Sequence, residues 1–300
     1  MSPSSPISRA SERGRKQVEH NVLSVVLGNL LIKPWYPSFY PQELVGSKID
    51  RLYICQWCFR YSKELMPFVS HTNQRACQLK ESAPPGSLIY EHGEVAIYEM
   101  DGGEHKMYTQ NLSLFAKLFL DTKSVFYDVT TFRYYALTFF DAVTAQRQVV
   151  GFFSKEKMSW DNNNLACILV FPPWQRRGLG QILMGTSYEL SRREGRLGGP
   201  EKPLSSLGRK GYLAYWSASI ARAILSAPKE KLSVQDIVQH TWILPEDVIT
   251  ALTVMNIVEA GPRAPVESII ARERVEEWSI KNKVALQPPV FSDAFTETAE

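Results

Sequence analysis

Alternating apolar and polar residues predict β-strands in the first half of the chain, and apolar residues at helical spacing predict helices further along. The run from Val22 to Ile32 is strand-like, and several short alternating runs between 87 and 153 predict a sheet. One of these runs is Phe132 to Phe140, and Gly102-Gly103 is the expected hairpin turn. Leu112 to Leu120 has the apolar spacing of a helix.

A second group of elements follows this sheet region. We predict a buried strand over Leu165 to Phe171, which leads through a turn into a long helix over about 179–194. Ser233 and Asp236 have the spacing of a helix N-cap and its acidic N3 partner, and Pro245 suits the first turn of the next helix. Two short helices separated by a turn predict a helix-turn-helix module.

The composition is that of an ordinary globular protein, with 44% hydrophobic and 22% charged residues, and it excludes a disordered or fibrous chain. The net charge is +3, so any contact with nucleic acid must come from a local patch. The most membrane-like run, Val22 to Ile32, is interrupted by polar residues and is shorter than the roughly 18–20 residues that span a bilayer. We therefore expect a soluble intracellular protein without a membrane partner.

Three of the four cysteines lie close together, and their spacing with a histidine predicts a metal site. Cys55, Cys58, His71 and Cys77 form a Cys-x2-Cys-x12-His-x5-Cys array. Zinc takes four such ligands in a tetrahedron, and the short x2 turn supplies two of them. Four protein ligands leave no open position, so we predict a structural zinc ion. The alternative is a pair of buried thiols beside an unrelated histidine and cysteine.

The segment Gln175 to Gly180, between the predicted strand and the long helix, has the features of an anion-binding turn. Gly178 and Gly180 allow a ligand to approach the backbone, and the helix N-terminus presents unpaired N–H groups that suit a pyrophosphate. Arg176 and Arg177 add positive charge. The spacing fits neither the Rossmann fingerprint nor the P-loop. Gln/Arg-x-x-Gly-x-Gly after a strand is instead the pattern by which N-acetyltransferases hold coenzyme A.

Several segments in order along the chain closely resemble the MYST-type histone acetyltransferases. They span roughly residues 25 to 260 and include Trp35 to Pro41, Gln110 to Leu112, Ala116 to Asp121, Pro172 to Gly180, Ser187 to Ser191 and Pro200 to Ser205. The small size resembles the fungal silencing-associated (SAS-type) subfamily. The resemblance implies an α+β fold, with a GNAT-like acetyl-CoA-binding core, an N-terminal C2HC zinc-finger subdomain and a C-terminal helix-turn-helix (winged-helix-like) module.

The resemblance also implies the catalytic residues, with Glu201 as the general base and Cys167 as the active-site cysteine. Glu201 would take the proton of a lysine amine, whose usual pKa near 10.4 keeps it charged at neutral pH. Cys167 would either relay the acetyl group in a ping-pong route or line the site during direct attack, and we favour direct attack. Residue type alone would favour a buried small hydrophobe for Cys167 and a solvated loop acid for Glu201.

Contacts with the coenzyme are implied in the same way. The backbone of Ile168 and Val170 would bind the pantetheine arm, because an extended ligand can pair like an added strand. Ser205 would contact the coenzyme, although a serine here also suits a turn or helix cap, and Lys123 would be autoacetylated unless it is simply an exposed lysine. The full predicted coenzyme set is Ile168, Val170, Gln175, Arg176, Arg177, Gly178, Leu179, Gly180, Gln181 and Ser205.

Some positions depart from the pattern of that family. Ser206 stands where an aspartate is usual, and Gly211 and Ala214 stand where serines are common, so we expect a coenzyme contact at Ala214 to be lost. Thr130-Thr131 replaces an acid-proline pair, and Arg209-Lys210 replaces an apolar pair. None of these changes removes a catalytic residue. We therefore expect an active enzyme, in which these changes alter the affinity for the coenzyme and the geometry of the bound substrate.

These observations predict a nuclear histone lysine acetyltransferase that uses acetyl-CoA and acts on histone tails and nucleosomes with accessory protein subunits. The expected parts are a flexible basic tail (1–20), a strand region with the C2HC zinc finger (21–85), the acetyltransferase core (86–226), the helix-turn-helix module (227–282) and a frayed tail (283–300). The main alternative is a catalytically decayed chromatin-binding subunit that uses the zinc finger and the helix-turn-helix module.

Direct contact with DNA is a further question. A sequence-specific zinc-finger reader is disfavoured, because one finger offers little area and residues 56–70 hold just two basic side chains, Arg60 and Lys63. Arg192, Arg193 and Arg196 would allow non-specific contact with phosphates, although a solvated helix face explains them equally well.

Overall fold

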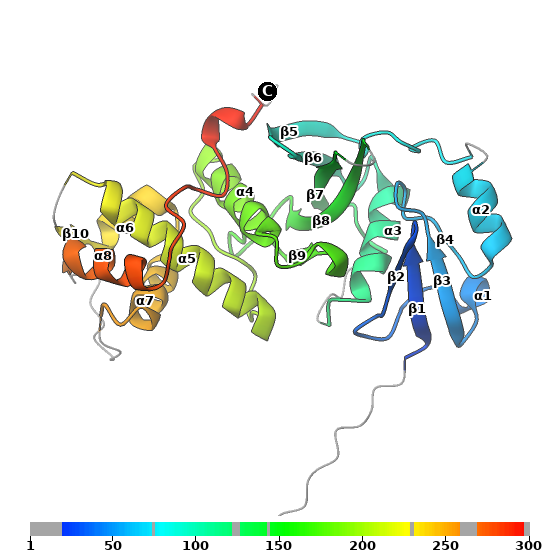
Figure 1. Cartoon of the computed structure of the whole chain (residues 1–300), viewed down its shortest axis with the longest axis horizontal. Helices are drawn as coiled ribbons and strands as arrows, with labels where there is room; N and C mark the ends of the chain where they lie inside the picture. The colour runs from blue at the N-terminus through cyan, green and yellow to red at the C-terminus, as the bar shows by residue number, and fades with distance from the viewer. Residues whose placement is uncertain are drawn as a thin grey trace, which may run out of the picture.

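The structure is a computed structural model, and it describes residues 20–73, 76–121, 127–142, 145–228, 231–258 and 269–296. A central antiparallel sheet lies between a smaller N-terminal sheet and a group of C-terminal helices (Figure 1). Its order is β5-β6-β7-β8-β9, with β5 (Ser87–His92), β6 (Val95–Asp101), β7 (Phe132–Asp141), β8 (Gln146–Glu156) and β9 (Cys167–Val170).

The smaller sheet has the order β2-β1-β3-β4, with β1 (Val22–Leu27), β2 (Leu30–Ile32), β3 (Ile49–Ile54) and β4 (Tyr61–Ser62). The predicted single run from Val22 to Ile32 is therefore a hairpin. Gly28 makes the turn with φ of 62°, and its N–H donates to Ile54 O at 3.0 Å. A glycine suits this left-handed position, since other residues are strained there.

Helices flank the two sheets. In chain order they are α1 (Gln42–Val45), α2 (Leu65–Asn73), α3 (Lys106–Lys117), α4 (Leu179–Arg193), α5 (Ser206–Ser226), α6 (Val234–Thr241), α7 (Pro245–Val254) and α8 (Arg272–Lys281), with 3-10 turns at Pro172–Trp174 and Ser292–Ala294. Among the described residues, no helix combines the length and the apolar composition needed to span a membrane.

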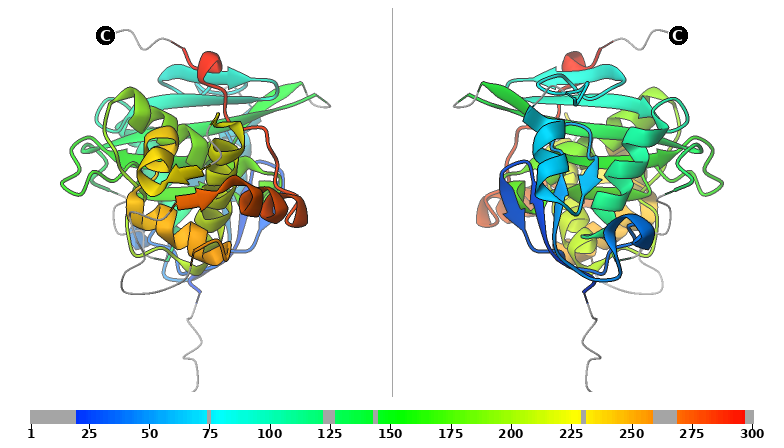
Figure 2. Two further views of the ribbon diagram at one scale, coloured as in Figure 1. Left: turned by 90° about the vertical axis from the view of Figure 1, so that its left-hand side faces the viewer. Right: turned by 90° about the vertical axis from the view of Figure 1, so that its right-hand side faces the viewer.

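The central sheet separates two hydrophobic cores, because successive residues of a strand face opposite sides. Tyr134 and Leu169 face α3 and the N-terminal sheet, whereas Tyr135 and Ile168 face α4 and the C-terminal helices. Figure 2 shows the C-terminal helices in front of the central sheet from one side and the N-terminal sheet in front of it from the other. Both faces of the sheet are thus covered, and its strand β9 lies at one edge.

Two predictions about this region need correction. The helix predicted from Leu112 begins at Lys106, because its first turns mix an exposed apolar residue, Met107, with a buried threonine, Thr109, whose hydroxyl donates to His105 O. Gly102-Gly103 does not form a hairpin turn but connects β6 to α3. A Cβ on Gly102 would lie 1.9 Å from Val129 O, so this glycine is required by a close backbone approach.

The C-terminal part combines helices α5 to α8 with a two-stranded sheet. Strand β10 (Lys231–Ser233) pairs antiparallel with β11 (Ile269–Ala271). The predicted helix start is confirmed, since the Ser233 hydroxyl accepts from the Asp236 N–H while the Asp236 carboxylate accepts from the Ser233 N–H. Pro245 begins α7, also as predicted.

The expectation of fraying after residue 283 is wrong as far as the chain is described. From Val284 the chain crosses α4 and reaches the edge of the central sheet at β5 (Figure 1). Phe295 forms a bridge with Tyr90, and their ring centroids are 4.7 Å apart. The Arg193 guanidinium donates to Ser292 O at 2.6 Å. An apolar contact and a charged hydrogen bond therefore hold this segment, which we call the C-terminal strap (residues 284–296).

Candidate functional site

The predicted metal ligands come from a turn and a helix of the N-terminal part. Cys55 and Cys58 lie in the turn between β3 and β4, where the Phe59 N–H donates to Cys55 O at 3.0 Å. His71 lies near the end of α2, and the Cys77 N–H donates to its carbonyl at 3.0 Å. Both pairs of ligands are thus oriented by local backbone hydrogen bonds.

The geometry of these four groups fits a tetrahedral zinc ion. The four ligand atoms lie within 4.8 Å of one another, and the Sγ atoms of Cys55 and Cys77 are 3.8 Å apart. Zinc–sulfur bonds of about 2.3 Å give a tetrahedron whose edge is about 3.8 Å. The hydrogen bond from the Cys58 thiol lowers the pKa of Cys55 to about 5, which favours the thiolate that binds zinc. The site is a structural zinc site, as predicted.

The predicted anion-binding turn connects β9 to α4. Gly178 is the N-cap of α4 with φ of 79°, and Arg176 also has a positive φ of 62°. A Cβ on Gly178 would meet no heavy atom within 4 Å, so the space outside the turn is open. The first N–H groups of a helix have no intrahelical partners, and the Arg176 and Arg177 side chains are exposed beside them. This turn fits a phosphate group.

The outer edge of β9 lies next to this turn. The Phe171 N–H donates to Val150 O of β8, and alternation along an antiparallel strand directs the polar backbone groups of Ile168 and Val170 away from β8. The Gln175 amide donates to Val170 O at 2.8 Å. The free edge suits an extended ligand that pairs like a strand, and it runs toward the positive end of α4.

Cys167 and Glu201 lie near the other end of β9. Cys167 is its first residue, half-buried and on the face that carries Tyr134. The Tyr134 and Ser113 hydroxyls are hydrogen-bonded at 2.9 Å, and burial raises the pKa of Tyr134. Glu201 is exposed, and its N–H donates to Leu165 O at 2.9 Å, two residues before Cys167. The structure therefore brings the backbones of the two proposed catalytic residues into one neighbourhood.

The residues that hold the loop carrying Glu201 could not be identified from sequence patterns. Asn164 is buried, and its N–H donates to Gly199 O at 2.8 Å. Lys202 Nζ donates to Asp247 Oδ1 at 2.8 Å across 45 positions of sequence. No local sequence pattern predicts a contact between residues this far apart in the chain. The available signal was the pair of acids, Glu246 and Asp247, that follows Pro245 in the sequence.

Other predicted residues lie around this site. Ser205 caps α5, and its hydroxyl accepts from the Gly208 N–H at 3.1 Å, which is the cap role considered from sequence. Gln181 Nε2 donates to Gly211 O at 3.3 Å, and Leu179 is buried at the start of α4. Lys123 lies outside the described residues.

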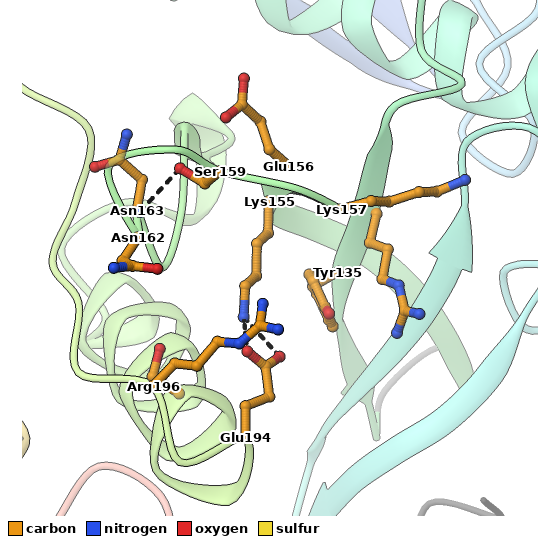
Figure 3. A pocket seen from close by; sticks show the side chains of 11 residues that line it. Tyr135, Lys155, Glu156, Lys157, Ser159, Asn162, Asn163, Glu194 and Arg196 are labelled. Atoms are coloured by element: carbon orange, nitrogen blue, oxygen red, sulfur yellow. Dashed lines mark hydrogen bonds and ion pairs between the residues drawn. The ribbon is translucent and has the colours of Figure 1, made fainter.

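The three arginines considered for contact with DNA differ in their surroundings. Arg192 and Arg193 both bind the carboxylate of Glu189, with nitrogen–oxygen distances of 2.6 and 2.9 Å. Arg196 lines a cavity of about 350 Å³, in which Lys155 points toward Glu194 and donates to it at 2.6 Å (Figure 3). Acidic partners thus offset most of the positive charge at this end of α4.

Comparisons with known proteins bear directly on this site. The MOZ/SAS family matches residues 83–291, and the MYST family zinc finger domain matches residues 20–77. The chain is 43% identical over 242 residues to the Histone acetyltransferase Tip60 homolog of Caenorhabditis elegans, covering 79% of this chain and 51% of that protein. It is 37% identical over 294 residues to the Histone acetyltransferase mst2 of Schizosaccharomyces pombe, covering 96% of this chain and 70% of that protein. It is 40% identical over 234 residues to the Histone acetyltransferase MOF of Drosophila melanogaster, covering 77% of this chain and 27% of that protein. The chain therefore spans about half the length of the first of these relatives, and less of the last.

Proposed function

The chain belongs to the MOZ/SAS family, and from this membership we propose that it transfers an acetyl group from acetyl-CoA to the ε-amine of a histone-tail lysine. The observation that carries the proposal is the edge strand β9 beside the turn at Gly178. Gly178 has a left-handed φ of 79° at the start of α4, and the space around it is open. An extended arm along the strand and an anion at the helix N-terminus are the two features of a coenzyme A site.

Binding of acetyl-CoA is assigned to backbone groups at both features. Ile168 and Val170 would pair with the pantetheine arm, and the N–H groups from Arg176 to Gly180 would bind the pyrophosphate, helped by the exposed charge of Arg177. The Gln181 N–H already donates to Gly178 O at 2.9 Å. Ser205 would lie at the edge of this site. Its hydroxyl already caps α5, so a coenzyme contact there would use its remaining lone pair or its proton.

The chemistry is assigned to Glu201 and Cys167. The Glu201 carboxylate would take a proton from the lysine ammonium, and the freed amine would attack the thioester carbonyl. A carbon–nitrogen bond forms, the carbon–sulfur bond breaks, and the released thiolate takes up a proton. Direct attack needs no bond to Cys167, which lines the site beside Tyr134. The named activity of the relatives favours this enzyme over a decayed chromatin-binding subunit.

The finer architecture follows the same proposal. We assign a GNAT-like core to residues 86–226 and a winged-helix-like helix-turn-helix module to residues 227–282, supported by β10, β11 and the helices between them. Histone tails and nucleosomes would be the substrates in the nucleus, with accessory subunits bound to the surface. Lys123 would be the site of autoacetylation. Arg196 would be the arginine available for contact with DNA, since Arg192 and Arg193 are engaged by Glu189.

One experiment tests the proposal as a whole. Histone octamer and nucleosome would be incubated with the protein and isotopically labelled acetyl-CoA, and mass spectrometry would locate labelled lysines. We expect label on histone-tail lysines, and a large loss of label with Glu201→Gln. Glu104→Gln is the matched control, because Glu104 is an exposed acid on the turn before α3. No label on any histone with the wild-type protein would refute the proposed function.

A further inference from the structure

The loop that carries Glu201 is held on its first side by the start of β9. The Glu201 N–H donates to Leu165 O at 2.9 Å, and Pro200 forms a parallel bridge with Leu165. One residue earlier, Gly199 O accepts from the Asn164 N–H at 2.8 Å. These bonds fix the backbone on the N-terminal side of Glu201.

Support on the second side comes from the C-terminal helices. Lys202 Nζ lies 2.8 Å from Asp247 Oδ1 and 3.8 Å from Glu246 Oε1. The Asp247 side chain is 4% exposed, against 46% for Lys202. Asp247 also lies in the first turn of α7, where the helix dipole favours a negative charge. The pair therefore joins an anchored carboxylate to the residue that follows Glu201.

The packing at this junction is tight. A Cβ on Gly199 would lie 2.9 Å from Leu244 Cδ1 and 3.2 Å from Asp247 Oδ2, so the start of α7 touches the loop directly. Among the described residues, Asp247 Oδ2 has no hydrogen-bond partner. Burial raises the pKa of Asp247, and Lys202 acts against this shift. The carboxylate thus depends on Lys202 for compensation of its buried charge.

We propose that Asp247 is a positioning residue for acetyl transfer. Through its ion pair with Lys202 it holds the Glu201 backbone in place, so that helix α7 contributes to the geometry of the active site. This inference rests on the proposed function, in which Glu201 is the base. Loss of the ion pair removes a contact that fixes this loop against α7. A base displaced by about 1 Å loses on the order of 10² in rate, even when the substituted residue lies outside the reacting groups.

The test compares Lys202→Met and Asp247→Asn with wild-type protein and with Lys157→Met as the matched control. Lys157, which follows β8, also forms an ion pair, with Asp101 of β6 at 2.7 Å. We expect kcat to fall about tenfold or more in the two test variants while the KM for acetyl-CoA stays within about twofold. The deficit should shrink at high pH, where free lysine amine is abundant. It should also vanish in the Glu201→Gln background, because the displaced base is already absent there.

A second measurement needs no turnover. Hydrogen exchange of the Glu201 amide should become at least about tenfold faster in both variants and remain unchanged in Lys157→Met. If Asp247→Asn does not fold, Lys202→Met decides, since half of that side chain is already in solvent. Unchanged exchange, unchanged kcat, or a loss that adds fully to that of Glu201→Gln would each overturn the positioning role. A wild-type protein that labels no histone would instead refute the proposed function, whatever the exchange result.

Discussion

A pair of glycine substitutions at the two ends of α4 tests the coenzyme site most directly. Gly178 begins the helix with φ of 79° and Gly195 follows it with φ of 64°, and a Cβ at either position meets nothing within 4 Å. A non-glycine residue in the left-handed region costs about 1–2 kcal/mol. Because neither site adds a steric clash, Gly178→Glu and Gly195→Glu should carry a similar backbone cost, and the helix dipole should favour the glutamate at position 178 by a further amount of about 0.3–1 kcal/mol.

The two variants should differ in their affinity for acetyl-CoA. A carboxylate about 5 Å from a phosphate charge costs about 0.8 kcal/mol per charge pair in bulk water, and more at a partly desolvated turn. Two such charges on a pyrophosphate give at least about 1.6 kcal/mol, which weakens binding by more than about tenfold. The Gly195 position adds the same charge at the opposite end of the helix, away from the turn.

Titration calorimetry with acetyl-CoA measures this difference, with thermal melting as the check on folding. We expect Gly178→Glu to bind more than about tenfold more weakly than Gly195→Glu, at comparable melting temperatures. Gly178→Ala, which keeps the N–H and adds no charge, should lie between wild type and Gly178→Glu. Equal affinity of the two glutamate variants, with both folded, would refute binding of the pyrophosphate at this turn.

Three further predictions follow from the same contacts. Cys58→Ser should release about one equivalent of zinc and lower the melting temperature, as metal analysis and thermal melts would show, and a variant that keeps both would contradict the zinc site. Glu201→Gln should lower kcat by a factor of about 10²–10⁴ at pH 7, and kcat should recover partly at high pH. Cys167→Ala that is loaded with acetyl-CoA should still turn over. If the pH–rate profiles show the reverse, the ping-pong route is favoured. Burial raises the pKa of Glu189, but hydrogen bonds from Arg192 and Arg193 outweigh burial and hold it below the usual value. Glu189 therefore stabilises the fold above about pH 4.3, so Glu189→Gln should lower the unfolding free energy at pH 7, and urea titrations should show the gap closing as the pH falls below that value.

Local sequence patterns correctly predict the features whose parts lie within a few residues of one another. The Cys55-x2-Cys58 turn, the cap of α6 at Ser233 and the start of α7 at Pro245 all occur where the pattern predicts them. The helix after Gly178 also has nearly the predicted length. Each of these depends on hydrogen bonds or dihedral angles that span one turn of chain, so residue type and spacing suffice to specify them.

Which distant segments of the chain come into contact depends on how the whole chain packs. Lys202 finds Asp247 across 45 positions, and Phe295 pairs with Tyr90 so that the C-terminal strap is ordered where fraying was expected. The local pattern at Gly102 predicts a hairpin turn, but this glycine is needed because the backbone of Val129 approaches it closely. Such contacts carry no periodic signal, because closing a long loop costs entropy that only the combined burial of many side chains offsets. That balance is a property of the whole packed chain, and it is what sets the position of the Glu201 loop.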